Sequence, residues 1–344
     1  MPSHMPELDG VRGMAILLVL AVHTVPRFVP LGWTGVVLFF VLSGFLITGI
    51  LLDGKSSGVA GARYFRVFYL KRSIRIFPIY YLTLLAVFVV GGLMDWPRSD
   101  LPWYLSYLQN FKINWDPLAP KPEFPAFMNQ TWSLAVEEQF YIVWPWPVFC
   151  LNRRQLAGVC VGFLTCAPFL RLYLSTYHPA TQYYYTLLPS QLDSLAAGAL
   201  LAIVVREMSL PALRRAAVWF TCLCAAGVIL FLMNPANDPL RRSMLPYFFV
   251  AAVALPILFP GGPLAKFCRA SPLRYFGKIS YGLYLYHPIV YHLTPAMLNR
   301  YPSLRASLGE FGEGLIGLSV SLAVSALSWH WFESRVNALK RRLS

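Results

Sequence analysis

An arginine and a histidine, Arg12 and His23, lie eleven residues apart inside the first apolar run of the chain. The run reads VRGMAILLVLAVHTV from Val11, and ionisable side chains are costly in hydrocarbon unless they face a cavity, a partner or a ligand. In a helix this spacing is about three turns and ~16 Å of rise, so both side chains lie on nearly one face. Alone, Arg12 could extend to lipid head groups and His23 could bond a neighbouring helix. Together they favour a functional site.

The composition places the whole chain in a lipid bilayer. Hydrophobic residues make up 57% of the 344 residues and charged residues 13%, whereas charged residues are about a quarter of soluble proteins. The mean hydropathy is +0.54. We therefore expect an all-α, polytopic membrane protein with about ten transmembrane helices, each of about twenty residues. The expected spans are 11–30, 33–52, 76–93, 131–150, 156–173, 185–205, 213–233, 244–260, 277–297 and 314–332.

The basic residues predict the orientation in the membrane. If both termini are cytoplasmic, twenty of the 29 Lys and Arg residues fall on the cytoplasmic side, as the positive-inside rule requires. Topology and contact with anionic membrane lipids then explain the net charge of +14. No basic motif with interleaved aromatic residues points to a nucleic acid partner. The sequence thus predicts a multi-pass protein of the cytoplasmic membrane.

The remaining features indicate a single membrane domain over residues 1–344. The residues before the first apolar run carry no basic cluster and no A-x-A-like site follows it, so we expect no cleaved signal peptide. The six cysteines lie in or beside expected spans without metal-ligand spacing, which predicts packing residues and no metal. We expect no appended soluble domain. The longest loop, 93–130, falls on the extracytoplasmic side and is a candidate lid.

Five sequence motifs follow one another along the chain. They are LDGVRGMAILLVLAVH from Leu8, FFVLSGFLIT from Phe39, YLKRSIRIFPIYYL from Tyr69, WSLAVEEQFY from Trp132 and ISYGLYLYHP from Ile279. In content, order and spacing they resemble the motifs of the acyltransferase 3 family of bacterial membrane proteins. The resemblance extends from about Glu7 to Glu333. One motif alone would be weak evidence, but the five together are specific.

The resemblance implies about ten transmembrane helices and the transfer of an acyl group, commonly acetyl from acetyl-CoA. The implied acceptor is a hydroxyl of a carbohydrate, a glycolipid or another exported molecule. The resemblance also implies that Arg12 and His23 are essential. Arg72 and Arg75 would help to bind the donor, and Glu137 occupies the recurrent acidic position of the family. Acyl-CoA is thus the expected donor substrate, and no metal cofactor is expected.

The chemistry of Arg72 and Arg75 agrees with donor binding. They are spaced i, i+3 at the expected cytoplasmic end of the third span, so they project together from a helix. Two guanidinium groups suit the phosphates of coenzyme A, which is a cytoplasmic donor. A cluster such as KRSIR at a cytoplasmic helix end is otherwise a topological anchor. The accompanying motifs favour donor binding.

His23 is the candidate general base, with Arg12 and Glu137 as further catalytic candidates. An alcohol that attacks a thioester must lose its proton, and a neutral imidazole is suited to accept it near neutral pH. The chain has no Gly-x-Ser-x-Gly elbow, so we expect direct transfer rather than an acyl-serine intermediate. We expect the Ser43–Gly44 pair in the second span to serve helix packing.

Depth in the membrane separates the other polar candidates. Helix rise puts Glu137 about 24 Å and Asp193 about 20 Å above the cytoplasmic ends of their spans, in the outer half. His287 lies about 14 Å up, close to the expected depth of His23. Outer carboxylates can bind sugar hydroxyls or cap a helix at the surface. We expect Glu137 to be functional and Glu138 to be structural.

A polar stripe and a proline complete the expected site. Tyr281, Tyr284 and His287 follow one another at i, i+3 on the ninth span, and with Asp193 they are the expected substrate-binding residues. Pro145 cannot donate a hydrogen bond to a carbonyl one turn earlier, so we expect it to kink the fourth span beside a cavity.

These observations predict a membrane O-acyltransferase that moves an acyl group from cytoplasmic acyl-CoA to a hydroxyl on the extracytoplasmic side. Acylation of a small natural product is an alternative. A proton-coupled secondary transporter would also place histidines and carboxylates at mid-depth, although no matched pair of Gly/Pro-broken segments supports it. The sequence does not specify the acceptor, the acyl chain length, the oligomeric state or whether a separate partner completes the transfer.

Overall fold

The computed structural model describes residues 5–58, 61–93, 99–112, 126–179, 181–233 and 242–340, and all regular elements in these ranges are helical. The longer helices are α1 (Pro6–Thr24), α2 (Thr34–Ser56), α3 (Gly61–Leu93), α8 (Arg153–Tyr177), α10 (Leu188–Glu207), α11 (Leu210–Met233), α15 (Ser271–Leu298) and α16 (Pro302–Ser328). The shorter ones are α4 (Leu101–Leu105), α5 (Gln109–Lys112), α6 (Trp132–Val143), α7 (Pro145–Cys150), α9 (Tyr183–Thr186), α13 (Leu245–Leu258), α14 (Pro263–Cys268), α17 (Ser334–Ala338), the 3₁₀ helix η1 (Ala126–Thr131) and the π-helical turn η2 (Trp329–Glu333). The prediction of an all-α fold is confirmed for this part of the chain.

Five helical segments in the described ranges are long and apolar enough to cross a membrane. They are Thr34–Ser56, Gly61–Gly92, Arg153–Tyr177, Tyr183–Glu207 and Pro302–Ala338. The other expected spans fall on helices that are shorter, broken, more polar or only partly described. The helices therefore support a multi-pass membrane protein, whereas ten spans and two cytoplasmic termini stay predictions.

Two helices differ in length from the spans expected for them. α1 ends at Thr24 because Val25, which precedes a proline, leaves the helical region at φ −138° and ψ 61°. α3 begins at Gly61 rather than at residue 76, so most of the expected cytoplasmic loop 53–75 is helical. The longer α3 places the basic cluster KRSIR inside a helix rather than at its end.

The region 93–150 contains more breaks than one loop and one span. The fourth span is divided, since α6 ends at Val143 and α7 starts at Pro145, the residue at which a kink was expected. The expected outer loop 93–130 contains α4, α5 and η1. Its residues 94–98 and 113–125 lie outside the described residues. The structure therefore describes only part of the segment that was expected to form a lid.

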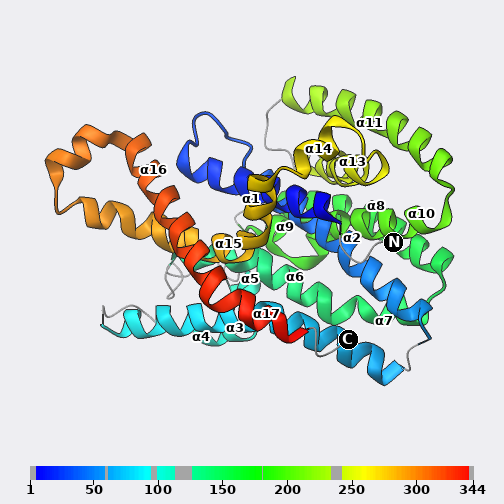
Figure 1. Ribbon diagram of the computed structural model, residues 1–344, viewed down its shortest axis with the longest axis horizontal. Helices are drawn as coiled ribbons and strands as arrows, with labels where there is room; N and C mark the ends of the chain where they lie inside the picture. The colour runs from blue at the N-terminus through cyan, green and yellow to red at the C-terminus, as the bar shows by residue number, and fades with distance from the viewer. Residues whose placement is uncertain are drawn as a thin grey trace.

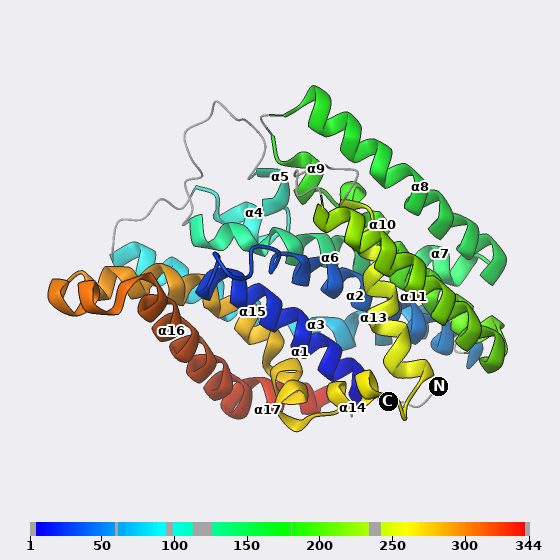
Figure 2. The same ribbon diagram turned by 90° about the horizontal axis from the view of Figure 1, so that it is seen from above.

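The helices form a bundle from which one hairpin projects (Figure 1). The last part of α15 and the first part of α16 extend away from the other helices in both views, and the second part of α16 returns towards the bundle (Figure 2). α3 lies along one face, where α17 packs against it. α1, α2, α3, α6 and α15 surround the polar centre of the bundle.

Two of the helix pairs that approach each other through glycines carry the polar centre. A Cβ atom on Gly198 of α10 would lie 1.9 Å from the carbonyl oxygen of Val41 in α2, and one on Gly44 would lie 1.9 Å from that of Leu195. The second pair is α1 with α15, where a Cβ atom on Gly277 would lie 1.8 Å from a carbonyl oxygen of α1. Small residues permit such contacts between membrane helices, which gain stability from close backbone packing. These crossings fix the helices that carry the polar centre.

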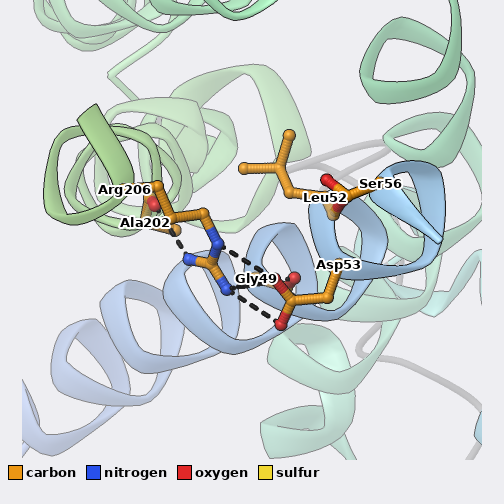
Figure 3. Close-up of polar contacts among 6 residues, drawn as sticks. All are labelled: Gly49, Leu52, Asp53, Ser56, Ala202 and Arg206. Atoms are coloured by element: carbon orange, nitrogen blue, oxygen red, sulfur yellow. Dashed lines mark hydrogen bonds and ion pairs between the residues drawn. The ribbon is translucent and has the colours of Figure 1, made fainter. Parts of the chain in front are cut away.

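An ion pair joins α2 and α10 near their shared end (Figure 3). The Arg206 guanidinium donates to both carboxylate oxygens of Asp53, at 2.9 and 3.0 Å. It also donates to the carbonyl oxygens of Ala202, at 2.9 Å, and Gly49, at 3.3 Å. The Arg206 side chain thus satisfies backbone groups of both helices and holds them in register.

We expect Gly198→Ala to lower the stability of the folded protein by about 1–3 kcal/mol, because the added methyl group must displace the α2 backbone. Thermal unfolding in detergent micelles measures the change. Gly162→Ala in α8 is the matched control, since a Cβ atom there would meet no atom within 4 Å. It should be neutral or stabilising by up to about 1 kcal/mol. Equal stability of the two variants would contradict the close α2–α10 contact.

Candidate active site

A polar cavity lies where α1, α2, α3, α6 and α15 meet, and we call it the inner cavity. Its free volume is about 80 Å³. Its polar lining consists of Arg12, Ser43, Arg72, Arg75, Ser133, Glu137, Tyr141, Ser280, Tyr281 and Tyr284, and apolar side chains complete the wall. Six of these residues were expected in the site from sequence, and the structure brings them to one cavity.

Arg12 enters the inner cavity from the second turn of α1. The helix begins with Pro6 in its first turn, a position that needs no backbone donor. Asp9, one turn before Arg12, pairs with its guanidinium at 3.5 Å, and both side chains are 15% exposed. An ion pair between partly buried groups lowers the cost of holding Arg12 inside the bundle.

Arg72 and Arg75 lie in the interior of α3. The sequence had predicted them at the end of the helix. Their i, i+3 spacing directs both side chains to the inner cavity. The Arg72 guanidinium lies 5.9 Å from the ring centre of Phe68 and 5.8 Å from that of Tyr141. Aromatic rings stabilise a cation that has few water molecules around it. Among the described residues no carboxylate forms an ion pair with Arg72, so its hydrogen-bond donors are not taken up in that way.

Glu137 lies in the same cavity as the arginines and not in a separate outer region. Its carboxylate accepts a hydrogen bond from the Ser43 hydroxyl at 2.5 Å, and Tyr141 donates to Ser43 at 3.1 Å. Arg12 and Arg75 line the same cavity as the Glu137 carboxylate. The depth difference expected from sequence disappears because α3 is longer than expected and carries its arginines deeper into the bundle.

Ser43 and Gly44 have different roles in the structure. Gly44 makes the close contact with α10, as expected for a packing pair. Ser43, one residue earlier, points the other way and hydrogen-bonds Glu137 in the cavity. The expectation that both residues serve packing is therefore correct only for Gly44.

His23 lies one layer outside the inner cavity, in the last turn of α1. Its Nδ1 is 2.8 Å from the carbonyl oxygen of Val19. A carbonyl can only accept, so Nδ1 carries the proton and Nε2 is left with a lone pair. The Gln130 side-chain amide donates to that lone pair at 3.1 Å. This tautomer is the one that a general base requires.

His287 lies beside His23 with its ring centre 5.0 Å away. Its Nδ1 also donates to a backbone carbonyl, that of Leu283, at 2.8 Å. Its Nε2 is buried and has no hydrogen-bond partner within the described part of the chain. The two histidines thus present two imidazole lone pairs in one region, one of them unsatisfied.

Tyr284 and Ser133 connect the inner cavity to the histidines. Both line the cavity and share a hydrogen bond of 2.5 Å. The Tyr284 hydroxyl also donates to the Gln130 carbonyl oxygen at 3.1 Å. Since the Gln130 side chain bonds His23, these side chains form a hydrogen-bonded layer between the inner cavity and His23.

A larger hollow begins on the other side of His23, and we call it the outer cleft. It is lined by residues 23–28 at the end of α1 and its following turn, by Tyr291, Thr294 and Pro295 of α15, and by Leu308, Gly309, Glu310, Phe311, Glu313 and Gly314 of α16. Its free volume is about 870 Å³. Arg12 and His23 therefore face two different spaces from one helix.

Three other expected residues lie in distinct places. Tyr281 lines the inner cavity and donates to the Ile76 carbonyl oxygen at 3.3 Å. Asp193 pairs with Arg171 between α10 and α8, where both side chains are at most 3% exposed. Asp193 does not line the inner cavity or the outer cleft, so the structure gives it a structural partner instead. Glu138 is buried near Arg72.

Sequence reasoning missed Gln130, Ser133 and Tyr141 in this site. All three lie within or next to the motif WSLAVEEQFY, which was the available signal. Helical spacing would have placed Ser133 and Tyr141 on the Glu137 face of α6. Within the described residues, no group of three or more His, Cys, Asp or Glu side chains could hold a metal ion.

The fold and the site define a membrane helix bundle with a cationic cavity on one side of a histidine layer and a wide cleft on the other. A family model described as an acyltransferase domain matches residues 5–330. The chain therefore belongs to the acyltransferase 3 family.

Curated relatives share this similarity at low identity. The chain is 29% identical to the putative peptidoglycan O-acetyltransferase YrhL of Bacillus subtilis, over 97% of the chain and 55% of the relative. It is 26% identical to the peptidoglycan O-acetyltransferase OatA of Listeria monocytogenes, over 97% of the chain and 56% of the relative. The O-acetyltransferase OatA of Staphylococcus aureus is 26% identical over 84% of the chain and 51% of the relative. The chain thus spans about half the length of these relatives. A comparison with solved structures gave no match.

We expect His23→Ala to lower acyl transfer about 10²–10⁴-fold, the usual contribution of a general base. The protein should stay folded, because His23 is only partly buried. The rate of acetyl transfer from radiolabelled acetyl-CoA by purified protein measures the effect. The matched control is His178→Ala, which changes an exposed histidine after α8. Turnover of His23→Ala close to that of the control would exclude the general-base role.

Proposed function

We propose that this chain transfers an acyl group, most simply acetyl, from cytoplasmic acyl-CoA to a hydroxyl of a carbohydrate or glycolipid on the extracytoplasmic side. The observation that carries this proposal is the position of His23. Its unprotonated Nε2 lies one side-chain layer away from a cavity lined by three arginines. This arrangement suits acyl-CoA, because its phosphates could bind in the cationic cavity while its thioester, at the other end of a flexible arm, reaches the base.

The inner cavity is suited to an anionic donor. Three guanidinium groups offer more donors than Asp9 and Glu137 accept, and guanidinium groups bind phosphate in two-pronged geometry. The positive field also reaches the chain after α17. Burial, and then the positive charges of the three cavity arginines, lower the pKa of Lys340 to about 7. A phosphate group that entered here would relieve this mutual repulsion of positive charges.

The transfer step then needs one base. The acceptor hydroxyl displaces the Gln130 amide at His23, and His23 Nε2 takes the hydroxyl proton as the oxygen attacks the thioester carbonyl carbon. The carbon–sulfur bond breaks, the acyl group stays on the acceptor oxygen, and the thiolate of coenzyme A receives the proton from His23. Arg12 and Glu137 belong to the donor side of this step, because both line the inner cavity.

The two spaces support a reaction across the bilayer. The donor phosphates stay near Arg72 and Arg75, while the flexible arm of acyl-CoA carries the thioester past Tyr284 towards His23. The acceptor approaches His23 through the outer cleft. Neither substrate then has to cross the membrane as a whole molecule.

We expect Arg72→Ala and Arg75→Ala each to weaken acetyl-CoA binding by about 1.5–3 kcal/mol, the range for hydrogen bonds to charged groups. Isothermal titration calorimetry on the detergent-solubilised protein measures the affinity. Arg66→Ala is the matched control, because Arg66 lies on the same helix with an exposed side chain. Unchanged affinity in both cavity variants would return Arg72 and Arg75 to the role of topological anchors.

Reconstituted vesicles test the sidedness. Acetyl-CoA is sealed inside, and a membrane-impermeant glycan acceptor is added outside. We expect acetylated glycan to accumulate outside while acetyl-CoA remains inside, because the two substrates meet only at His23. If the glycan is acetylated only when it shares a compartment with acetyl-CoA, transfer across the bilayer is wrong.

A further inference from the structure

The outer cleft has the chemistry of a carbohydrate site. Three charged side chains line it, Arg27 from the turn after α1 and Glu310 and Glu313 from α16. Glu313 already accepts from the Arg305 guanidinium at 2.6 Å. A lipid tail would gain nothing from these groups, whereas sugar hydroxyls can donate to the remaining lone pairs of the carboxylates and accept from the Arg27 guanidinium. The polar lining therefore favours a polyhydroxylated occupant over hydrocarbon.

Aromatic rings add flat apolar surfaces to the same walls. Phe28 on one side is 81% exposed, and Phe311 on the other is 57% exposed. Tyr291 lies deeper, where its hydroxyl shares a hydrogen bond of 2.5 Å with Thr24. Rings of this kind can pack on the apolar faces of sugar rings, while the polar groups fix the orientation of the sugar, as in most small-molecule sites.

At the rim of the cleft an exposed ion pair joins the two walls. The Arg27 guanidinium lies 3.3 Å from the Glu310 carboxylate, and the side chains are 81% and 84% exposed. Exposed ion pairs contribute at most about 1 kcal/mol to stability. The pair can therefore open and exchange its hydrogen bonds for those of a ligand at little cost.

The backbone of α16 is shaped around the cleft. Gly309 has φ +60° and ψ −175°, a conformation that interrupts the helix and that is almost restricted to glycine. The break turns Leu308 and Glu310 onto the rim of the cleft. A helix that continued straight through this position would not present the same wall.

The inner end of the cleft reaches the reacting group. His23 and Thr24 line the cleft, and the buried Nε2 of His287 beside them has no partner among the described residues. The Nε2 atom of His287 is therefore an acceptor that receives no hydrogen bond from the described residues. A substrate with two neighbouring hydroxyls could bond both histidines.

We propose that the outer cleft is the acceptor site and binds a sugar unit of a glycan or glycolipid, with Glu313 and Phe311 as binding residues and the reacting hydroxyl at His23. This inference rests on the proposed function, because it assigns the acceptor to a defined place. Glu313 and Phe311 lie outside the five motifs, and these two residues would determine which acceptor is used.

Steady-state kinetics of Phe311→Ala and Glu313→Gln test the inference. The donor is acetyl-CoA, and two acceptor probes distinguish the sources of the sugar, soluble peptidoglycan glycan chains and a lipid-linked disaccharide. For whichever probe the wild type acetylates, we expect the acceptor KM to rise about tenfold in each variant, the effect of losing one good contact. The kcat and the KM for acetyl-CoA should stay unchanged.

Matched controls are Phe169→Ala and Glu207→Gln, which remove an exposed aromatic ring and an exposed, ion-paired carboxylate far from the cleft. Phe28→Ala on the opposite wall replaces either cleft variant that fails to fold in a thermal-unfolding assay. If the folded cleft variants keep the wild-type KM for the acceptor, the assignment of the outer cleft as the acceptor site is wrong, while the proposed function is unaffected. A wild-type protein that acetylates neither probe would instead contradict the proposed carbohydrate transfer, and the inference with it.

Discussion

The partial burial of three guanidinium groups in an apolar helix bundle is the constraint on which the structure depends. A buried charge without partners costs several kcal/mol, so each guanidinium needs partners at fixed positions. Asp9 pairs with Arg12, aromatic rings flank Arg72, and Glu137 shares the same cavity. These partners come from different helices, and the cavity therefore exists only when the helices are correctly assembled. The remaining donors are available to an anionic ligand.

Glycine contacts supply the positional accuracy that this arrangement requires. The crossing of α2 and α10 through Gly44 and Gly198 leaves no space for a side chain, so α2 can present Ser43 to Glu137 in one register only. The close contact of α1 and α15 at Gly277 likewise fixes the register of α1, which carries His23, against α15, which carries Tyr281 and Tyr284. Close backbone contact is an effective way to fix helices in a membrane, where lipid reduces the hydrophobic gain of helix packing.

The layer formed by Tyr284, Gln130 and His23 divides the polar interior into two spaces of opposite character. The inner cavity is narrow and cationic, whereas the outer cleft is wide and carries carboxylates and exposed aromatic rings. α1 contributes to both, because Arg12 and His23 lie on one face at different depths. A single helix thus links the cationic cavity to the wide cleft.

The sequence by itself determined the all-α membrane class, the family motifs and the shared face of Arg12 and His23, because hydropathy and helical period are local properties. Only the tertiary structure decided which faces meet. It placed Arg72 and Glu137 in one cavity, joined Ser43 to Glu137, paired Asp193 with Arg171 and brought Gln130 to His23. Hydropathy also placed the start of α3 too late, since Arg72 and Arg75, which lowered it, line the inner cavity. Helical period shows which residues share a face, but the neighbour of that face depends on how distant segments pack.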